Sequence, residues 1–469
     1  MDGLFDMRHH QKKVVVIGGG TAGVIAAIAA ARQGCSVCVI EQNGYLGGVA
    51  GFGIPFLAFK DGHGRRVVGG IAEELIEKMK AIDASPGHVG GAYWNGPGSR
   101  QQFHLTPYDP EGYKVVILQM AQQAGVSLQL HAFFHGVEKD TSGRVTAVWV
   151  TNKDGLVKID GDVFIDATGD ADVVRRAGFP CRAAKEGQRL QNVSGIFVLG
   201  GVSAERALDA MKAGDHLEGW DDWHTRIVHG DLVEGQKGIN HFAGIMKPWQ
   251  DARSLAFTAV SWRQNVYSLN ISRTTGIDGS RQDDLVRAEI SERNNMYEIY
   301  QAIKRHVPGF ENSFLMTTSP MVGIRESVNI AGLYTMTAQD VLEAREHDDN
   351  IARGCYPIDI HDPKGGHTQF MFIRDGGSYG IPFRSLVPTQ SVNLLVAGRC
   401  LSATHEAHGS TRIMATAMAV GEAAGTAAAL AVSESADVPT VDIKALQKHL
   451  RQQGAILDLD EIVMMVSEN

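Results

Sequence analysis

The sequence predicts an α/β protein: a parallel sheet flanked by helices, assembled from separated pieces of the chain, with a second, mixed α+β domain beside it. Two observations lead to this prediction. Residues 13–17 form a buried-strand pattern that enters a glycine-rich turn and an alanine-rich segment, and residues 36–41 form a second strand pattern, so that together they make a βαβ unit. Much later, residues 391–399 repeat the apolar strand pattern, and an Ala/Gly-rich helix is predicted at 411–432. The first domain therefore draws on both ends of the chain.

Composition limits the classes of protein and partner that fit the chain. Its 469 residues leave room for two large domains, and 44% hydrophobic with 21% charged residues is typical of an ordinary folded protein. A net charge of −9 argues against nucleic acid or an anionic membrane as the main partner, and no apolar stretch is expected to reach the roughly 18 residues that span a bilayer. Five scattered cysteines indicate a reducing compartment. We expect a cytoplasmic protein that binds a small molecule; the sequence leaves open whether it forms a homo-oligomer.

The first βαβ unit carries a dinucleotide-binding pattern. Gly18, Gly20 and Gly23 form G-x-G-x-x-G after the strand and at the start of the helix, and Glu41 ends the next strand. These glycines allow a tight turn, backbone approach to a pyrophosphate and close helix packing, while the helix N-terminus attracts phosphate charge. Glu41 would accept hydrogen bonds from ribose hydroxyls and disfavours the 2′-phosphate of NADP. The pattern predicts a Rossmann-like domain; the alternative is a glycine turn of another α/β protein.

Segments after this fingerprint favour FAD over NAD. Gly47 and Gly48 follow Glu41 where an FAD enzyme needs backbone close to the ribityl diphosphate, and the segment 163–170 forms a strand that ends in a small turn at residues 168–170. Each turn alone could be structural. Together with the strand at 391–399, they follow the order of segments in FAD proteins of the glutathione-reductase-like superfamily. No second G-x-G-x-x-G lies in a strand–turn–helix context, so a separate electron donor or acceptor is expected.

The remaining patterns divide the chain. Helices are predicted at 70–82 and 114–124, strands alternate through 126–166, and the Gly- and Pro-rich residues 84–112 are interpreted as a loop long enough to cover a site. Mixed patterns, with helices near 203–213, 281–305 and 337–346, indicate a domain that covers the substrate. The predicted division is an FAD-binding domain at 1–181 and 379–435, a substrate domain at 182–378 and a C-terminal helical extension at 436–469.

Nearly the whole chain resembles a family of bacterial FAD-dependent oxidoreductases. The resemblance rests on YGIPFRSLVPTQSVNLLVAGRCLSATHEAHGST (379–411), preceded by MVGIRESVNIAGLYTMTAQDV (321–341) and IARGCYPIDIHDPKGG (351–366). Phe383 stands where the family pattern commonly has tyrosine, and Gly409 where alanine is frequent. The resemblance implies an FAD domain similar to that of the succinate dehydrogenase and fumarate reductase flavoproteins.

The residues expected to bind FAD come from all these segments. A helix beginning near Thr411 would aim its positive end at the flavin, where it can stabilise the negative charge of the reduced form. The full predicted set is Gly18, Gly20, Thr21, Ala22, Gly23, Glu41, Gln42, Gly47, Gly48, Phe134, Ala167, Thr168, Gly169, Asp170, Gly398, Arg399, Ile413 and Met414.

The candidate catalytic residues are His405, His408, Arg412 and Arg325. The two histidines lie three residues apart and are expected before the helix, so they do not match the HExxH zinc motif, and no metal site is expected. Histidine can move a proton near neutral pH, and arginine can hold a carboxylate or an oxyanion. Each histidine could instead be a structural, hydrogen-bonded residue. Arg325 and Glu326 resemble a family motif that faces the cofactor, and a buried structural ion pair is the alternative.

The function expected from these residues is FAD-dependent oxidoreduction of a small organic molecule. The favoured reaction moves hydride between the substrate and flavin N5, with oxidation of a C–OH or C–NH bond. One alternative is reduction of an activated C=C bond with arginine as the proton donor. Another is an FAD protein that acts on RNA or serves as an electron carrier.

Overall fold

The computed structural model describes residues 9–96, 99–182, 190–213, 220–227, 240–249, 253–361 and 368–459. A seven-stranded sheet carries the first core, in the order β6-β2-β1-β9-β8-β7 with β22 paired to β9. The strands β6, β2, β1, β9 and β22 pair in parallel, and β8 and β7 extend the sheet antiparallel. This mixed α/β architecture confirms the predicted fold class. The strand bounds are β1 His9–Ile17, β2 Val37–Glu41, β6 Ser127–Leu130, β7 Phe133–Lys139, β8 Val145–Asn152, β9 Gly155–Asp166 and β22 Leu394–Val396.

The parallel strands from separated parts of the chain end level with one another. Ile17 pairs with Ile40 on one side and with Asp166 on the other, and Asp166 in turn pairs with Val396. The carboxyl ends of β2, β1, β9 and β22 therefore form one edge. Ligands of open α/β sheets bind at this kind of edge.

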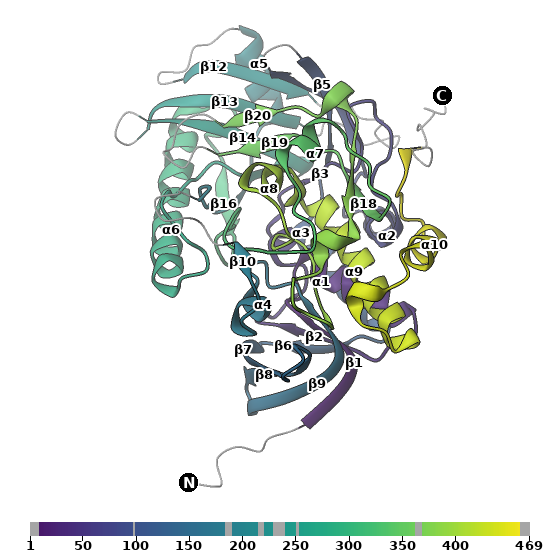
Figure 1. Cartoon of the computed structure of the whole chain (residues 1–469). Coiled ribbons are helices and arrows are strands. Elements are labelled where there is room, and N and C mark those ends of the chain that lie inside the picture. Colours follow the sequence, from purple (N-terminus) through teal and green to yellow (C-terminus); the bar gives the residue numbers. More distant parts are fainter. Residues whose placement is uncertain are drawn as a thin grey trace.

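Helices α1 (Thr21–Arg32) and α9 (Met414–Glu434) cross at very close range over the sheet (Figure 1). An added Cβ at Gly421 would lie 2.2 Å from the backbone oxygen of Ala22, and one at Gly425 would lie 2.0 Å from that of Ala26. Only glycine allows this approach. The contact ties the two ends of the first domain together, because α1 follows β1 and α9 follows β22.

Helix α9 is the one described helix whose length and apolar composition would allow it to cross a membrane. Because 89% of its apolar window is buried inside the protein, its composition is that of a core helix. The expectation that no apolar stretch reaches such a length is therefore wrong for this helix.

Glu422 of α9 is buried against the start of helix α2 (Gly70–Ala81), where its Oε2 accepts a hydrogen bond of 2.9 Å from the Ile71 N–H. Burial raises the pKa of Glu422 to about 8. A raised pKa in the folded state means that this group's contribution to stability is complete below its unfolded value near 4.5 and is lost as pH rises to about 8.

We therefore expect Glu422→Gln to gain stability relative to the wild type as pH rises from 5 to 8, by roughly 1–4 kcal/mol. Urea unfolding of the FAD-free proteins at several pH values measures this difference. A difference that does not change with pH would show that Glu422 is not buried as described.

A six-stranded antiparallel sheet, in the order β12-β13-β14-β15-β11-β16, forms a second layer at the upper end of Figure 1. Helix α6 (Gln282–His306) covers it, because Met296, Ile299 and Ile303 pack with Phe197 and Leu269 of the sheet. The bounds are β11 Phe197–Gly200, β12 Trp220–Ile227, β13 Asn240–Trp249, β14 Arg253–Arg263, β15 Val266–Leu269, β16 Phe314–Thr318 and, for the adjoining helix α5, Ala204–Ala213.

The chain returns to the first core before residue 378. Apolar side chains of residues 328–373 pack into the core of the seven-stranded sheet, whereas the sequence analysis placed them in the substrate domain. The elements of this return are β17 Asn329–Ile330, α7 Ala338–Leu342, β18 Asn350–Gly354, β19 Ile358–Ile360, β20 Gln369–Met371, η2 Arg374–Gly376, β21 Tyr379–Pro382 and η3 Phe383–Leu386. Strand β18 pairs with β21, and β17 pairs with β10 (Cys181–Arg182).

Two predicted elements differ from the structure. Residues 84–112 are not one long loop, because β4 (Val89–Gly96) and β5 (Ser99–Thr106) pair within a three-stranded sheet with β3 (Phe56–Leu57). The helix predicted at 411–432 is α9, which begins at Met414, and a separate short helix, α8 (His405–Thr411), precedes it, so both candidate histidines lie in a helix rather than before one. The remaining bounds are η1 Gly48–Phe52, α3 Pro110–Gln123, α4 Asp172–Arg176, η4 Val438–Thr440 and α10 Ile443–Gln452.

Candidate active site

The three glycine turns predicted to bind the dinucleotide meet at the carboxyl edge of the sheet. Gly18 has φ +99°, and an added Cβ would lie 2.4 Å from the backbone oxygen of Ala167. Gly398, which follows β22, also has a positive φ, and its added Cβ would lie 3.0 Å from the Cβ of Ala22. The turns after β1, β9 and β22 therefore surround the start of α1.

Gly20 differs from its neighbours because an added Cβ would meet no atom of the described residues within 4 Å. Its backbone, with φ −68° and ψ −170°, is a conformation that any residue adopts, so the protein fold alone does not require glycine here. No side chain caps α1, although Ala22 and Gly23 in its first turn are buried. An uncapped, buried helix start beside open space is suited to a phosphate group.

The turn at Gly47 and Gly48 is hydrogen-bonded directly to the G-x-G-x-x-G turn. The Gly47 N–H donates to the Gly19 oxygen at 2.8 Å, and the Thr21 hydroxyl donates to the Gly47 oxygen at 2.9 Å. Glu41 is buried at the end of β2, where its carboxylate accepts hydrogen bonds from the Gly19 N–H and from Asn43. Burial raises the pKa of Glu41.

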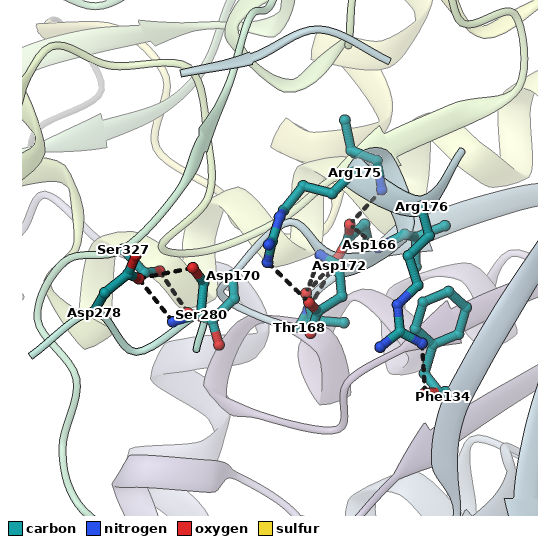
Figure 2. A network of polar contacts seen from close by, with 12 residues as sticks. Phe134, Asp166, Thr168, Asp170, Asp172, Arg175, Arg176, Asp278, Ser280 and Ser327 are labelled. Atoms are coloured by element: carbon teal, nitrogen blue, oxygen red, sulfur yellow. Dashed lines mark hydrogen bonds and ion pairs between the residues drawn. The ribbon is translucent and has the colours of Figure 1, made fainter. Parts of the chain in front are cut away.

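Of the other residues predicted near Glu41, Gln42 is exposed, whereas Phe134 is half-buried in β7. The Arg176 guanidinium lies 5.1 Å from the centre of the Phe134 ring and donates to the Phe134 oxygen (Figure 2). Phe134 lies near the same edge of the sheet. Ala132, two residues before it, donates its N–H to the backbone oxygen of Glu41.

Asp166 organises the turn that contains Ala167, Thr168, Gly169 and Asp170. One carboxylate oxygen accepts from the backbone and hydroxyl of Thr168, and the other accepts from the Val173 and Val174 N–H groups at the start of α4 (Figure 2). Burial raises the pKa of Asp166 to about 6. The carboxylate therefore has a structural role that the sequence analysis did not identify.

Asp170, Ser327 and Arg399 join three distant segments in one polar network. Arg399 lies 2.7 Å from the Asp170 carboxylate and donates to the Ser327 hydroxyl at 2.5 Å, and that hydroxyl donates to Asp170. This network fixes the turn after β22 against the turn after β9.

Helix α9 begins without a capping side chain. Its N-cap is Ile413, Met414 is half-buried, and Ala415 and Thr416 are fully buried. The Thr416 hydroxyl has no hydrogen-bond partner among the described residues. The starts of α1 and α9 are therefore both buried and without capping side chains, and each can accept negative charge.

The two candidate histidines occupy different environments in α8. His405 Nδ1 lies 2.6 Å from a Glu326 oxygen, and this hydrogen bond raises the pKa of His405. His408 is buried, its Nε2 lies 3.0 Å from the Arg399 oxygen, and burial lowers its pKa to about 4. The Nδ1 atom of His408 has no hydrogen-bond partner within the described parts of the chain. His405 therefore tends to hold a proton, and His408 is neutral at pH 7.

Arg325 and Glu326 do not form the ion pair considered from the sequence. Arg325 donates to the Asn192 oxygen at 2.7 Å and to the Ser194 hydroxyl at 2.8 Å, while Glu326 accepts from the Gln191 N–H and contacts His405. The two adjacent residues therefore face separate groups.

Arg412 lies against a buried acid that the sequence analysis missed. Its Nη2 is 3.4 Å from a carboxylate oxygen of Asp359 in β19, and the two side chains are only 11% and 8% exposed. Helix α8 packs directly on this strand, because an added Cβ at Gly409 would lie 2.9 Å from the Asp359 oxygen. His361 and Arg273 also interact with Asp359. No local motif connects Arg273, Asp359 and His361, and the run IDIH offers no spacing that would have indicated them.

A parallel sheet with glycine turns at its carboxyl edge, two open helix starts and a neighbouring group of charged side chains defines a dinucleotide-binding enzyme. The family model described as "FAD dependent oxidoreductase" matches residues 13–450, so the chain belongs to this family. It is an FAD-dependent oxidoreductase, and the resemblance seen in the sequence is confirmed. A search of curated proteins finds no match.

Solved structures with a similar arrangement are distant in sequence. A geranylgeranyl bacteriochlorophyll reductase-like protein from Thermoplasma acidophilum is 13% identical, with a TM-score of 0.46 over 95% of this chain and 83% of that one. The flavin-dependent brominase Bmp2 is 15% identical, with a TM-score of 0.46 over 94% and 83%. The myxobacterial chondrochloren halogenase CndH is 11% identical, with a TM-score of 0.48 over 95% and 79%.

The residues present are suited to FAD. The open space at Gly20 and the uncapped start of α1 could take the pyrophosphate, and Glu41 could bind a ribose. The uncapped start of α9 could stabilise charge on the flavin ring. Among the described residues, no group of His, Cys, Asp and Glu side chains is arranged to hold a metal ion.

Proposed function

We propose that the protein oxidises a C–OH or C–NH bond of a small organic substrate. Bound FAD would supply the redox chemistry by taking the hydride at N5. The observation that carries the proposal is the position of Arg412. This residue directly precedes the N-cap of α9 and contacts the buried Asp359, so a charged substrate group held there would lie beside the helix start suited to the flavin.

Oxidation of a C–OH or C–NH bond releases a proton as well as a hydride, so a neutral base is needed. His408 is neutral at pH 7, its Nδ1 has no hydrogen-bond partner among the residues that the structure describes, and it stands one helical turn before Arg412. Arg412 and Arg325 would orient an anionic group of the substrate through charge-assisted hydrogen bonds. The position of these side chains favours His408 as the base.

Reduction of an activated C=C bond is the second candidate, and the His405–Glu326 pair favours it. The hydrogen bond that raises the pKa of His405 stabilises its protonated form. A protonated imidazole can deliver the proton that such a reduction consumes. The protonation states of the two histidines therefore distinguish the two candidate reactions: a neutral His408 favours oxidation, and a protonated His405 favours reduction.

Anaerobic mixing of the FAD-loaded protein with candidate alcohols and amines tests the proposal through loss of the flavin absorbance. With a substrate that bleaches the flavin, His408→Ala should slow bleaching roughly 10²–10⁴-fold, as expected for loss of a general base. His306→Ala, at the exposed end of α6, is the matched control and should leave the rate unchanged.

The outcome of two variants decides the assignment. A rate that falls in His405→Ala but not in His408→Ala would transfer the proton-moving role to His405. Unchanged rates in both variants, with FAD still bound, would remove the histidines from the mechanism.

A further inference from the structure

Helix α6, at the left margin of Figure 1, carries apolar side chains on its outer face. Val286, Ile290 and Tyr297 are 48%, 62% and 56% exposed, and their spacing of four and seven residues places them on one side of the helix. The neighbouring strand β16 adds exposed Phe314 and Met316. Of the ten large apolar side chains that are exposed in the described parts of the chain, five therefore lie on these two elements. Apolar surface gathered in this way marks a contact with another molecule.

A hollow of about 410 Å³ lies between α6 and β16, beside the apolar side chains of the helix. It is lined by Arg293, Asn294, Tyr297 and Glu298 of α6 and by Leu315 and Thr318 of β16. Strand β16 is an edge strand, because among the described strands it pairs only with β11. Proteins commonly cover such an edge to prevent uncontrolled pairing. The hollow offers room for a side chain of a partner.

The inner face of α6 holds the helix in one position. Glu292 is fully buried and accepts a hydrogen bond of 2.6 Å from the Gly195 N–H. Met296 and Ile299 pack into the core of the six-stranded sheet. The outer face is therefore ordered before any partner binds, which lowers the entropy lost on binding.

The two ends of this outer face carry opposite charges. Steps of three or four residues lead along one side of the helix, through Asp283, Val286, Ile290, Asn294, Tyr297, Gln301 and Arg305. Asp283 has no ion-pair partner within the described residues, and the Arg305 Nε donates to the backbone oxygen of Gln301 rather than to a carboxylate. An acidic start and a basic end thus flank the apolar middle.

A second copy of the chain matches this pattern when its α6 runs antiparallel to the first. Asn294 lies midway between Asp283 and Arg305 in the sequence. A two-fold axis beside Asn294 therefore brings Asp283 opposite Arg305 of the partner subunit. The same axis brings Ile290 beside the partner's Tyr297, at the hollow. A parallel arrangement would instead place like charges together at each end.

We propose that α6 is the contact surface of a homodimer, in which the two α6 helices pack antiparallel about a two-fold axis near Asn294. Each subunit covers the exposed Val286, Ile290 and Tyr297 of the other, and the Asp283–Arg305 pair occurs twice. Use of the same surface by both subunits is the ordinary form of a two-fold dimer. The inference does not depend on the proposed function, because α6 lies outside the glycine turns suited to FAD.

Sedimentation velocity of the FAD-loaded full chain, at concentrations from about 0.5 to about 50 μM, tests the dimer. The expected species has about twice the 50.6 kDa mass of one chain. Ile290→Glu should weaken dimerisation at least about 10-fold, because it would bury a charge in the apolar middle of the contact. Val115→Glu, at a position of α3 that is 50% exposed, is the matched control and should dimerise as the wild type does. Tyr297→Ala adds no charge and serves if the Ile290 variant folds poorly.

Exchange of the two end charges tests the antiparallel direction. Asp283→Arg and Arg305→Asp should each weaken dimerisation by about 3- to 10-fold, because the two-fold axis repeats every pair and turns attraction into repulsion. The double variant, Asp283→Arg with Arg305→Asp, restores opposite charges across the axis. Its dimerisation should return to within about 3-fold of the wild type. Circular dichroism and retained FAD confirm that each variant is folded.

Three results would overturn the inference. A monomer at every concentration would mean that the outer face of α6 does not bind a second copy and serves a different partner. A dimer that is unaffected by both Ile290→Glu and Tyr297→Ala would have its contact elsewhere. A double charge variant that stays as weak as the single variants would contradict the antiparallel pairing.

Discussion

Gly20→Val should fold as the wild type does but fail to retain FAD. An added Cβ at this position meets no atom of the described residues within 4 Å, and the backbone conformation accepts valine, so the FAD-free protein should keep its stability. The same side chain would fill the space through which the turn approaches the pyrophosphate. We expect FAD binding to weaken at least about 100-fold, or about 2.7 kcal/mol. Flavin absorbance after purification and titration with added FAD measure the loss.

Gly136→Val is the matched control, because Gly136 in β7 also has open space at its Cβ position and an ordinary φ. This variant should bind FAD normally. If Gly20→Val also binds FAD normally, the pyrophosphate does not lie at the fingerprint turn.

Gly425→Ala should destabilise the protein although it improves helix propensity. In an unhindered helix interior, replacing glycine by alanine stabilises by about 1 kcal/mol. Here the added methyl group would lie 2.0 Å from the backbone oxygen of Ala26, which cannot move without separating α1 from α9. We expect a net loss of about 1–3 kcal/mol in the free energy of unfolding. Urea unfolding of the FAD-free protein measures it.

The sign of this change distinguishes packing from propensity. Ala419→Gly, at a half-buried position of the same helix, should lose only about 1 kcal/mol through propensity. A gain of stability in Gly425→Ala would mean that α1 and α9 are not in such close contact.

Local patterns predicted the parts of the fold that depend on neighbouring residues. The fingerprint at Gly18–Gly23, the strand that ends at Glu41 and the turn after Asp166 each combine an apolar run with a glycine turn, and both signals are short-range. The order of these segments also predicted one discontinuous sheet, and the register of Ile17, Asp166 and Val396 confirms this part of the prediction.

Elements stabilised by distant partners could not be predicted in this way. Strands β4 and β5 contain glycine and polar residues typical of a loop, and pairing with each other and with β3 supplies their hydrogen bonds. The return of residues 328–373 to the first core depends on tertiary packing rather than on periodicity. Helix α8 did carry a local signal, because Thr404 caps it by accepting from the Ala407 N–H.

The residues of the candidate site also divide into those with a local sequence signal and those without one. Residues of the dinucleotide turns belong to a motif, whereas Arg273 lies far from Asp359 and His361 in the sequence and meets them only in the folded chain. A lone arginine after a strand carries no sequence signal of its own. The group of charged side chains around Asp359 is therefore visible only in three dimensions.

A crystal structure of the FAD-loaded protein would test most directly whether the three separated segments bind one cofactor. The account predicts the pyrophosphate at the Gly20 backbone and the start of α1, with the flavin ring at the start of α9 near Met414. A flavin ring directed away from α9, or a pyrophosphate bound elsewhere, would contradict it.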